Sequence, residues 1–185
     1  MNLNLPNLLS LLRMGLIPLF VIALLRGEAV KALAIFVLAG LSDALDGFLA
    51  RVLDQRSLLG AYLDPIADKL LLTTAYIGLT VLEGETGLVP IPVWVTVLII
   101  ARDVVILVVA LALALALDVA EFPPTALSKL NTVCQIAGVI LVLLSGPYDW
   151  VDRPAAVGLY VVGALTVASG VDYIYRANRL VGAGE

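Results

Sequence analysis

Four aspartates are the residues of this chain whose spacing points most directly to chemistry. Asp43 and Asp46 lie in one long apolar segment, and Asp64 and Asp68 lie in the next. A charged side chain inside a membrane segment costs about 2.5–3.5 kcal/mol on insertion scales, and four nearby carboxylates also repel one another. A divalent cation offsets both costs, since carboxylate oxygens are hard ligands suited to magnesium, manganese or calcium. The four aspartates therefore predict a metal site.

Each pair of aspartates shares a helical face with small residues. The spacing on the first face is i, i+3, i+4 and i+7, over Asp43, Asp46, Gly47 and Ala50. The spacing on the second face is i, i+4 and i+8, over Gly60, Asp64 and Asp68. A short polar turn joins the two helices, so the faces can oppose one another, and the small residues leave room for a ligand. Arg51 lies beside this site and can hold a phosphate.

A purely structural role for the aspartates is the alternative. They would then cap helices or pair with Arg51, Arg56 and Lys69 at a membrane interface. One aspartate would suit that role. Four on two facing stripes favour a functional site, because ionisable residues inside a membrane usually mark one.

Composition excludes several other chemistries. The 185-residue chain has no histidine, which excludes Ser-His-Asp and Cys-His catalysis, histidine-ligated zinc and haem ligation by histidine. Hydrophobic residues make up 62% of the chain and charged residues 14%, which excludes a disordered chain and a water-soluble globule. The net charge of −4 offers no basic face to nucleic acid. Carboxylates remain as the acid, base and metal-binding groups.

Six apolar stretches are long enough to cross a membrane, which takes about 20 residues. Short polar or Pro/Gly segments separate them, so neighbouring helices are antiparallel and residues 1–185 form a single membrane domain. The expected spans are Pro6–Leu25, Ala29–Val52, Ser57–Leu82, Ile91–Leu117, Thr125–Ser145 and Ala155–Tyr175. The predicted fold is an all-α integral membrane protein, a compact bundle of six transmembrane helices.

Basic residues give the expected orientation, since loops rich in Lys and Arg stay in the cytoplasm. With six spans both termini lie on one side, which also holds Arg51, Arg56, Lys129, Arg176 and Arg179. We therefore expect cytoplasmic termini and a polar active-site cavity on the cytoplasmic side of a bacterial inner membrane. Arg13 inside the first stretch argues against a cleaved signal peptide.

The spaced aspartates also carry a resemblance to a known family. The pattern is Asp43-x-x-Asp46-Gly47-x-x-Ala50-Arg51 and, after eight further residues, Gly60-x-x-x-Asp64-x-x-x-Asp68. Eight residues are thus fixed across 26 positions. This pattern resembles, without a departure, the signature of the CDP-alcohol phosphotransferase family, and the six apolar stretches resemble that family as well.

The resemblance implies a transfer of a substituted phosphate from a CDP-alcohol, here CDP-diacylglycerol, to a hydroxyl with release of CMP. It implies two divalent cations, Mg²⁺ or Mn²⁺, surrounded by Asp43, Asp46, Asp64 and Asp68, with Asp68 as the base for the acceptor hydroxyl. It places around CDP the residues Gly47, Ala50, Arg51 and Gly60, with Ser10 and Arg13 reaching the nucleotide from the first helix. Family members are commonly dimers, so a homodimer in contact with membrane lipids is expected.

Two branches of the family fit the flanking sequence. The opening Leu5–Arg13 resembles both the CMP-forming cardiolipin synthases, with phosphatidylglycerol as acceptor, and the phosphatidylglycerophosphate synthases, with glycerol 3-phosphate as acceptor. The segment Ser128–Thr132 resembles the first branch, and Asn131 stands where the second more often has a lysine. A phosphodiester carries one charge and needs fewer cations than a phosphate monoester of nearly two. Phosphatidylglycerol is therefore the favoured acceptor, and glycerol 3-phosphate is the alternative.

Arg102 and Lys129 are the candidate clamp for the acceptor phosphate. Arg102 lies about midway along the fourth span, where it is costly unless it faces the polar cavity or pairs with Asp103. Adjacent helix residues face different directions, so a structural pair of this kind is expected to be poor. Lys129 has an equally simple alternative role as a snorkelling anchor at the interface.

Two other classes of protein also bury carboxylates in helical bundles. An ion-coupled transporter has no need for Arg51 beside a stripe of small residues. A membrane prenyltransferase binds a diphosphate through metal-bridged aspartates, which suits the second half of the aspartate pattern but not the first. Metal-dependent release of CMP from CDP-diacylglycerol separates a phosphatidyltransferase from both.

Overall fold

The structure, a computed structural model, describes residues 5–52, 58–82, 86–117 and 125–182. Within these ranges the chain forms six α-helices and one short 3-10 helix and no strand. In chain order they are α1 (Leu5–Leu25), α2 (Ala29–Val52), α3 (Leu58–Val81), α4 (Val93–Leu117), α5 (Ala126–Ser145), η1 (Asp149–Val151) and α6 (Asp152–Gly182). The prediction of an all-helical chain is confirmed.

The helices agree with the expected apolar stretches to within a few residues, except at the C-terminal end of α6. This helix starts at Asp152, ahead of the expected Ala155, because Pro154 fits the first turn of a helix, where no amide hydrogen is needed. It continues beyond Tyr175 to Gly182, although the apolar stretch has ended. Arg176 there donates to Asp172 one turn earlier at 3.2 Å, a pairing that supports a helix in polar sequence.

Local signals in the sequence explain where two of the helices begin or end. The side chain of Thr125 accepts a hydrogen bond from the amide of Ser128 at 3.0 Å, which caps the start of α5. Gly27 follows α1 with a φ of 68°, a conformation that favours glycine. Its amide donates to the carbonyl of Leu24 at 2.9 Å. The resulting turn folds α2 back along α1.

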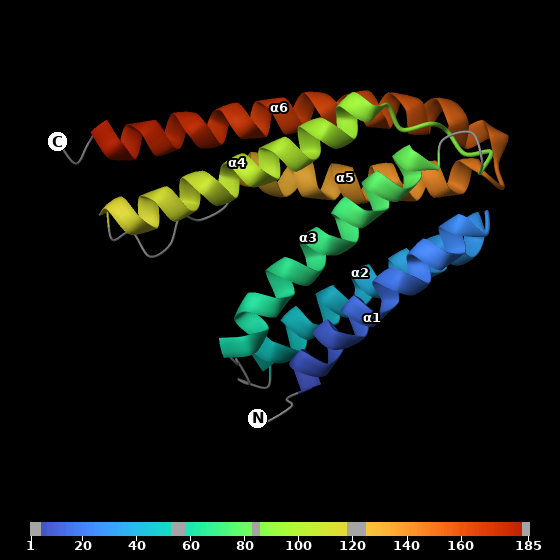
Figure 1. Cartoon of the computed structure of the whole chain (residues 1–185), viewed down its shortest axis with the longest axis horizontal. Coiled ribbons are helices and arrows are strands. Elements are labelled where there is room, and N and C mark those ends of the chain that lie inside the picture. Colours follow the sequence, from blue (N-terminus) through green and yellow to red (C-terminus); the bar gives the residue numbers. More distant parts are fainter. Residues whose placement is uncertain (1–4, 53–57, 83–85, 118–124, 183–185) are drawn as a thin grey trace.

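The six long helices form two groups of three (Figure 1). In one group α1 packs along α2 and against α3, and in the other α6 packs along α5 and against α4. The groups meet on the right of the view and diverge toward the left, where α2 ends and α3 begins. Contacts of α3 with α4 and α5, and of α2 with α5, join the two groups.

An apolar core fills the contacts between these helices. The rings of Phe20 on α1 and Phe36 on α2 pack in a tilted arrangement with centroids 5.9 Å apart, and both residues are buried. Tyr76 of α3 is fully buried, and its hydroxyl donates to the carbonyl of Gln135 on α5 at 3.0 Å. This bond satisfies the one polar atom of the Tyr76 side chain and fastens α3 to the second group.

Three helices within the described residues are long and apolar enough to cross a membrane: Val93–Ala112, Ala126–Ser145 and Asp149–Arg179. The described apolar parts of the first two helices are shorter, Leu11–Leu25 and Ala29–Ser42. Large apolar side chains such as Leu107 and Val161 face outward. The chain is therefore a helical membrane protein, while the arrangement with six spans stays a prediction.

We expect Gly163→Ala to destabilise the contact between α4 and α6. A Cβ atom at Gly163 would lie 2.6 and 2.8 Å from two ring carbons of Trp94, and overpacking of this kind costs about 1–3 kcal/mol. Gly158→Ala on the same helix is the control, because its Cβ would meet Leu141 at an ordinary 3.5 Å and alanine is the better helix former. Thermal unfolding in detergent measures both variants, and equal melting temperatures would contradict this packing.

Candidate active site

The aspartate motif occupies two helices that contact each other. Asp43 and Asp46 lie in the C-terminal half of α2, and Asp64 and Asp68 lie in the N-terminal half of α3. Both stretches are helical, so the spacing keeps each pair on one helical face. Several predicted site residues have side chains outside the described part and stay predictions: Ser10, Asp43, Asp46, Gly47, Ala50, Arg51, Gly60 and Asp64.

Asp68 is a motif residue whose side chain is described. It is half-buried and lines a cavity of about 220 Å³ between α2, α3 and α5. The other walls of this cavity are apolar, among them Phe36, Leu72 and Ile140. An apolar wall of this kind keeps bulk water from one side of the carboxylate.

Arg13 lies fully buried in α1. This helix packs against both motif helices, α2 and α3. A guanidinium taken out of water needs compensating negative groups close by. Arg13 therefore brings a cation to the motif helices, and its predicted contact with the nucleotide stays a prediction.

The donor chemistry of the motif fits a hard divalent cation. Four carboxylates on two neighbouring helices supply only oxygen ligands, the type that Mg²⁺ and Mn²⁺ prefer. Among the side chains that the structure describes, no cluster of three or more His, Cys, Asp or Glu could hold a metal ion elsewhere.

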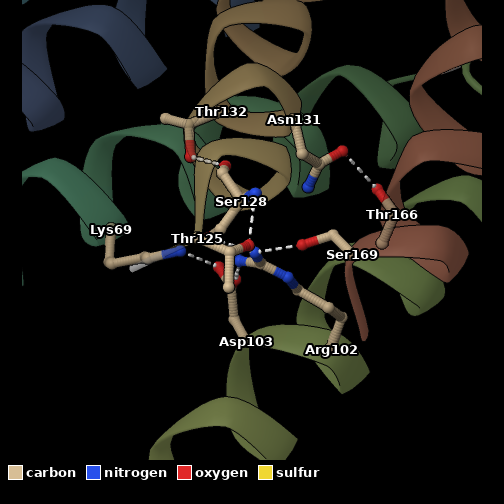
Figure 2. Close-up of polar contacts among 9 residues, drawn as sticks. All are labelled: Lys69, Arg102, Asp103, Thr125, Ser128, Asn131, Thr132, Thr166 and Ser169. Carbon is tan, nitrogen blue, oxygen red and sulfur yellow. Dashed lines mark hydrogen bonds and ion pairs between the residues drawn. The ribbon is translucent and has the colours of Figure 1, made fainter. Parts of the chain in front are cut away.

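Arg102 of α4 is the centre of a polar network that joins four helices (Figure 2). Its side chain is buried, with 7% of the residue exposed. Nη1 donates to Oδ1 of Asp103 at 2.8 Å, and Nη2 donates to the hydroxyls of Ser128 on α5 at 2.5 Å and Ser169 on α6 at 2.6 Å. The other oxygen of Asp103 accepts from Nζ of Lys69 on α3 at 2.6 Å.

The expectation that Arg102 and Asp103 pair poorly is wrong. The rule for adjacent residues describes the directions in which their side chains leave the helix. The arginine side chain is long enough to bend back, so that one guanidinium nitrogen reaches the neighbouring carboxylate while another reaches two other helices. The pairing fixes the orientation of the guanidinium.

Lys129 differs from Arg102 in its surroundings. It is exposed on α5, whereas the preceding residue, Ser128, contacts Arg102. Within the described part of the chain, Lys129 forms no ion pair that would join it to the network around Arg102. A joint role of Arg102 and Lys129 on one phosphate stays a prediction.

Three buried donors near this network have no hydrogen-bond partner among the described residues. They are Nε of Arg102, Nδ2 of Asn131 and Nε2 of Gln135. Asn131 is fully buried, and its Oδ1 accepts from the hydroxyl of Thr166 on α6 at 3.1 Å. Buried donors without a partner are costly, so oxygens of a ligand or of bound water are their natural complement.

Sequence reasoning missed several members of the network. Thr166 and Ser169 were not singled out, and Lys69 was considered only as a partner for the motif aspartates. A usable signal was present, because Thr166 and Ser169 are spaced i, i+3 in apolar sequence, as are Ser128 and Asn131. Polar residues that recur at helical spacing inside a membrane segment predict a shared buried face.

Comparison with known proteins shows the family of this chain. The family model of the CDP-alcohol phosphatidyltransferases matches residues 3–168, and the chain belongs to this family of membrane enzymes. A probable phosphatidylglycerophosphate synthase of Mycobacterium tuberculosis is 39% identical over 97% of this chain and 84% of its own length. A CMP-forming cardiolipin synthase of Streptomyces coelicolor is 36% identical over 98% of this chain and 86% of its own length. A CMP-forming cardiolipin synthase of Homo sapiens is 34% identical over 95% of this chain. The chain spans 62% of the human relative.

We expect Arg102→Lys to lower phosphatidyl transfer at least about tenfold. A lysine ammonium lacks the planar fork that reaches Asp103, Ser128 and Ser169 together, and a hydrogen bond to a charged group contributes about 1.5–3 kcal/mol. Arg176→Lys is the control, since this half-exposed arginine pairs with Asp172 on the surface of its own helix. The rate of CMP release measures the activity of both variants, and equal rates would contradict a role for the Arg102 guanidinium in the transfer.

Proposed function

We propose that this phosphatidyltransferase moves the phosphatidyl group of CDP-diacylglycerol to phosphatidylglycerol, which gives cardiolipin and CMP. Family membership and the aspartate motif on α2 and α3 support the transfer chemistry. The observation that carries the choice of acceptor is the neutral, fully buried amide of Asn131, bonded to Thr166 beside the Arg102 network.

The charge around Asn131 favours an acceptor with one negative charge. Arg102 is the buried cation of this region, and its partner Asp103 removes part of its charge. A phosphodiester such as that of phosphatidylglycerol carries a single charge, whereas the monoester of glycerol 3-phosphate carries nearly two. A neutral amide at position 131 donates a hydrogen bond without adding the further cation that a monoester favours.

Each residue has a defined role in the proposed transfer. The four motif aspartates would hold two divalent cations, Mg²⁺ or Mn²⁺, which when bound neutralise the diphosphate and the charge that develops on CMP. Asp68 takes the proton of the acceptor hydroxyl. The oxygen of that hydroxyl forms a bond to the phosphorus that carries diacylglycerol, and the bond from this phosphorus to the bridging oxygen breaks. CMP leaves with the bridging oxygen.

The remaining predicted residues position the two substrates. Around CDP we place Gly47, Ala50, Arg51 and Gly60 of the motif together with Ser10 and Arg13 of α1. Arg102 and Lys129 hold the phosphate of the acceptor. The whole chain acts as one membrane domain with six spans, as a homodimer in a bacterial inner membrane, with its termini and active site on the cytoplasmic side.

Glycerol 3-phosphate is the second candidate acceptor. The M. tuberculosis relative, at 39% identity, is described as a probable phosphatidylglycerophosphate synthase, and a CDP-diacylglycerol–glycerol-3-phosphate 3-phosphatidyltransferase of Sodalis glossinidius is 32% identical over 97% of both chains. In this case Arg102 and Lys129 would face a phosphate with nearly two negative charges.

Product analysis tests the acceptor directly. Purified chain, CDP-diacylglycerol and Mg²⁺ or Mn²⁺ are incubated with phosphatidylglycerol in one reaction and glycerol 3-phosphate in another. We expect CMP and cardiolipin in the first reaction. Phosphatidylglycerophosphate from the second reaction alone would replace the proposed acceptor and leave the transfer chemistry standing, whereas no CMP from either would contradict both acceptors.

Asp68→Asn tests the proposed base. Asparagine keeps the size of the side chain but cannot accept the proton, and general-base catalysis contributes about 10²–10⁴-fold. We expect CMP release to fall by at least about 100-fold, with the fold retained. Asp172→Asn is the matched control on α6, where the carboxylate pairs with Arg176. An active Asp68→Asn enzyme would remove Asp68 from the role of base.

A further inference from the structure

Lys69 follows a predicted metal ligand in the sequence but points to another carboxylate. It comes directly after Asp68 on α3, and its Nζ contacts Oδ2 of Asp103 on α4 at 2.6 Å. We propose that Asp103 is a positioning residue that holds the Lys69 ammonium away from Asp68, so that Lys69 does not compete with a divalent cation for the motif carboxylates. This inference rests on the metal site of the proposed function.

A released Lys69 would be able to turn toward Asp68. Arg102 gives an example of a long cationic side chain that contacts the carboxylate next to it in the sequence, Asp103, at 2.8 Å. The Lys69 side chain is 43% exposed, so neighbouring groups leave it room to move. An ammonium donates hydrogen bonds to carboxylate oxygens and carries the same sign of charge as the metal, so it competes with the metal for them.

The surroundings of Asp103 fix the position of the carboxylate that binds this ammonium. Its carboxylate is largely buried, with 17% of the side chain exposed, and its other oxygen is fixed by Arg102. Arg102 is fixed in turn by Ser128 and Ser169 on two further helices. Figure 2 shows the chain of contacts that runs from Lys69 through Asp103 to Arg102. A partly buried pair with one rigid member is worth more than an exposed pair of mobile side chains.

A simpler role is that the Lys69–Asp103 pair only braces α3 against α4. The two roles predict opposite results when Lys69 is removed. If the pair only holds the two helices together, removing Lys69 and removing Asp103 weaken metal binding equally. If Asp103 instead restrains a competing cation, the loss of Asp103 is harmful only while Lys69 is present.

Binding of Mn²⁺ to the purified full chain in detergent tests this inference without any turnover. The electron paramagnetic resonance signal of free Mn²⁺ measures the affinity of the wild type, Asp103→Asn, Lys69→Met and the double variant. We expect Asp103→Asn to weaken binding about tenfold, the lower end of effects seen for residues that support metal ligands. Lys69→Met should bind at least as tightly as the wild type, and the double variant should bind as Lys69→Met does.

Lys31→Met is the control, because Lys31 pairs with Glu28 on the exposed start of α2. Wild-type affinity in Asp103→Asn, or a double variant no better than Asp103→Asn, overturns the inference. If Asp103→Asn does not fold, Lys69→Met decides, since weaker binding than wild type overturns the inference and equal or tighter binding supports it. A wild-type chain that binds no Mn²⁺ overturns the proposed metal site as well, which distinguishes the two failures.

Discussion

A guanidinium buried in an apolar span is the constraint on which the packing of α3 to α6 depends. The hydrocarbon region of a membrane offers no water to the hydrogen-bond donors of Arg102, so the protein must supply the oxygens. Its own helix supplies one carboxylate, Asp103, and the hydroxyls of Ser128 and Ser169 come from α5 and α6. The three helices therefore have to approach one another at this depth, and Lys69 brings α3 to the same point.

The network contains more positive than negative charge, and this excess connects packing to function. Two cations, Arg102 and Lys69, share the single carboxylate of Asp103. The Lys69 side chain is 43% exposed, whereas Arg102 is buried. The buried amide donor of Asn131 has no partner in the described part of the chain. The region around Asn131 and Arg102 is therefore short of both negative charge and acceptor oxygens. A phosphodiester supplies both.

Much of the fold follows from the sequence, because helix ends are set by local chemistry. The apolar stretch Ala29–Val52 predicts both ends of α2. Thr125 caps the start of α5 through its side chain. The end of α6 was missed, because a polar sequence that ends an apolar stretch need not end a helix. The aspartate motif was found from spacing alone. The Arg102 network was not, because it depends on where the ends of long side chains meet across helices far apart in sequence.

The division into two helix groups makes physical sense for an enzyme that brings a donor and an acceptor substrate together. The motif lies on α2 and α3, while the residues proposed to hold the acceptor lie on α4 and α5. Transfer requires the donor phosphorus and the acceptor hydroxyl to be held within a few ångströms, and small misplacements cost much of the rate. The ion pair of Lys69 and Asp103 crosses from α3 to α4 between these two sets of residues. A charge pair at this junction acts on both at once, since the same carboxylate orients Arg102 and restrains the cation next to Asp68.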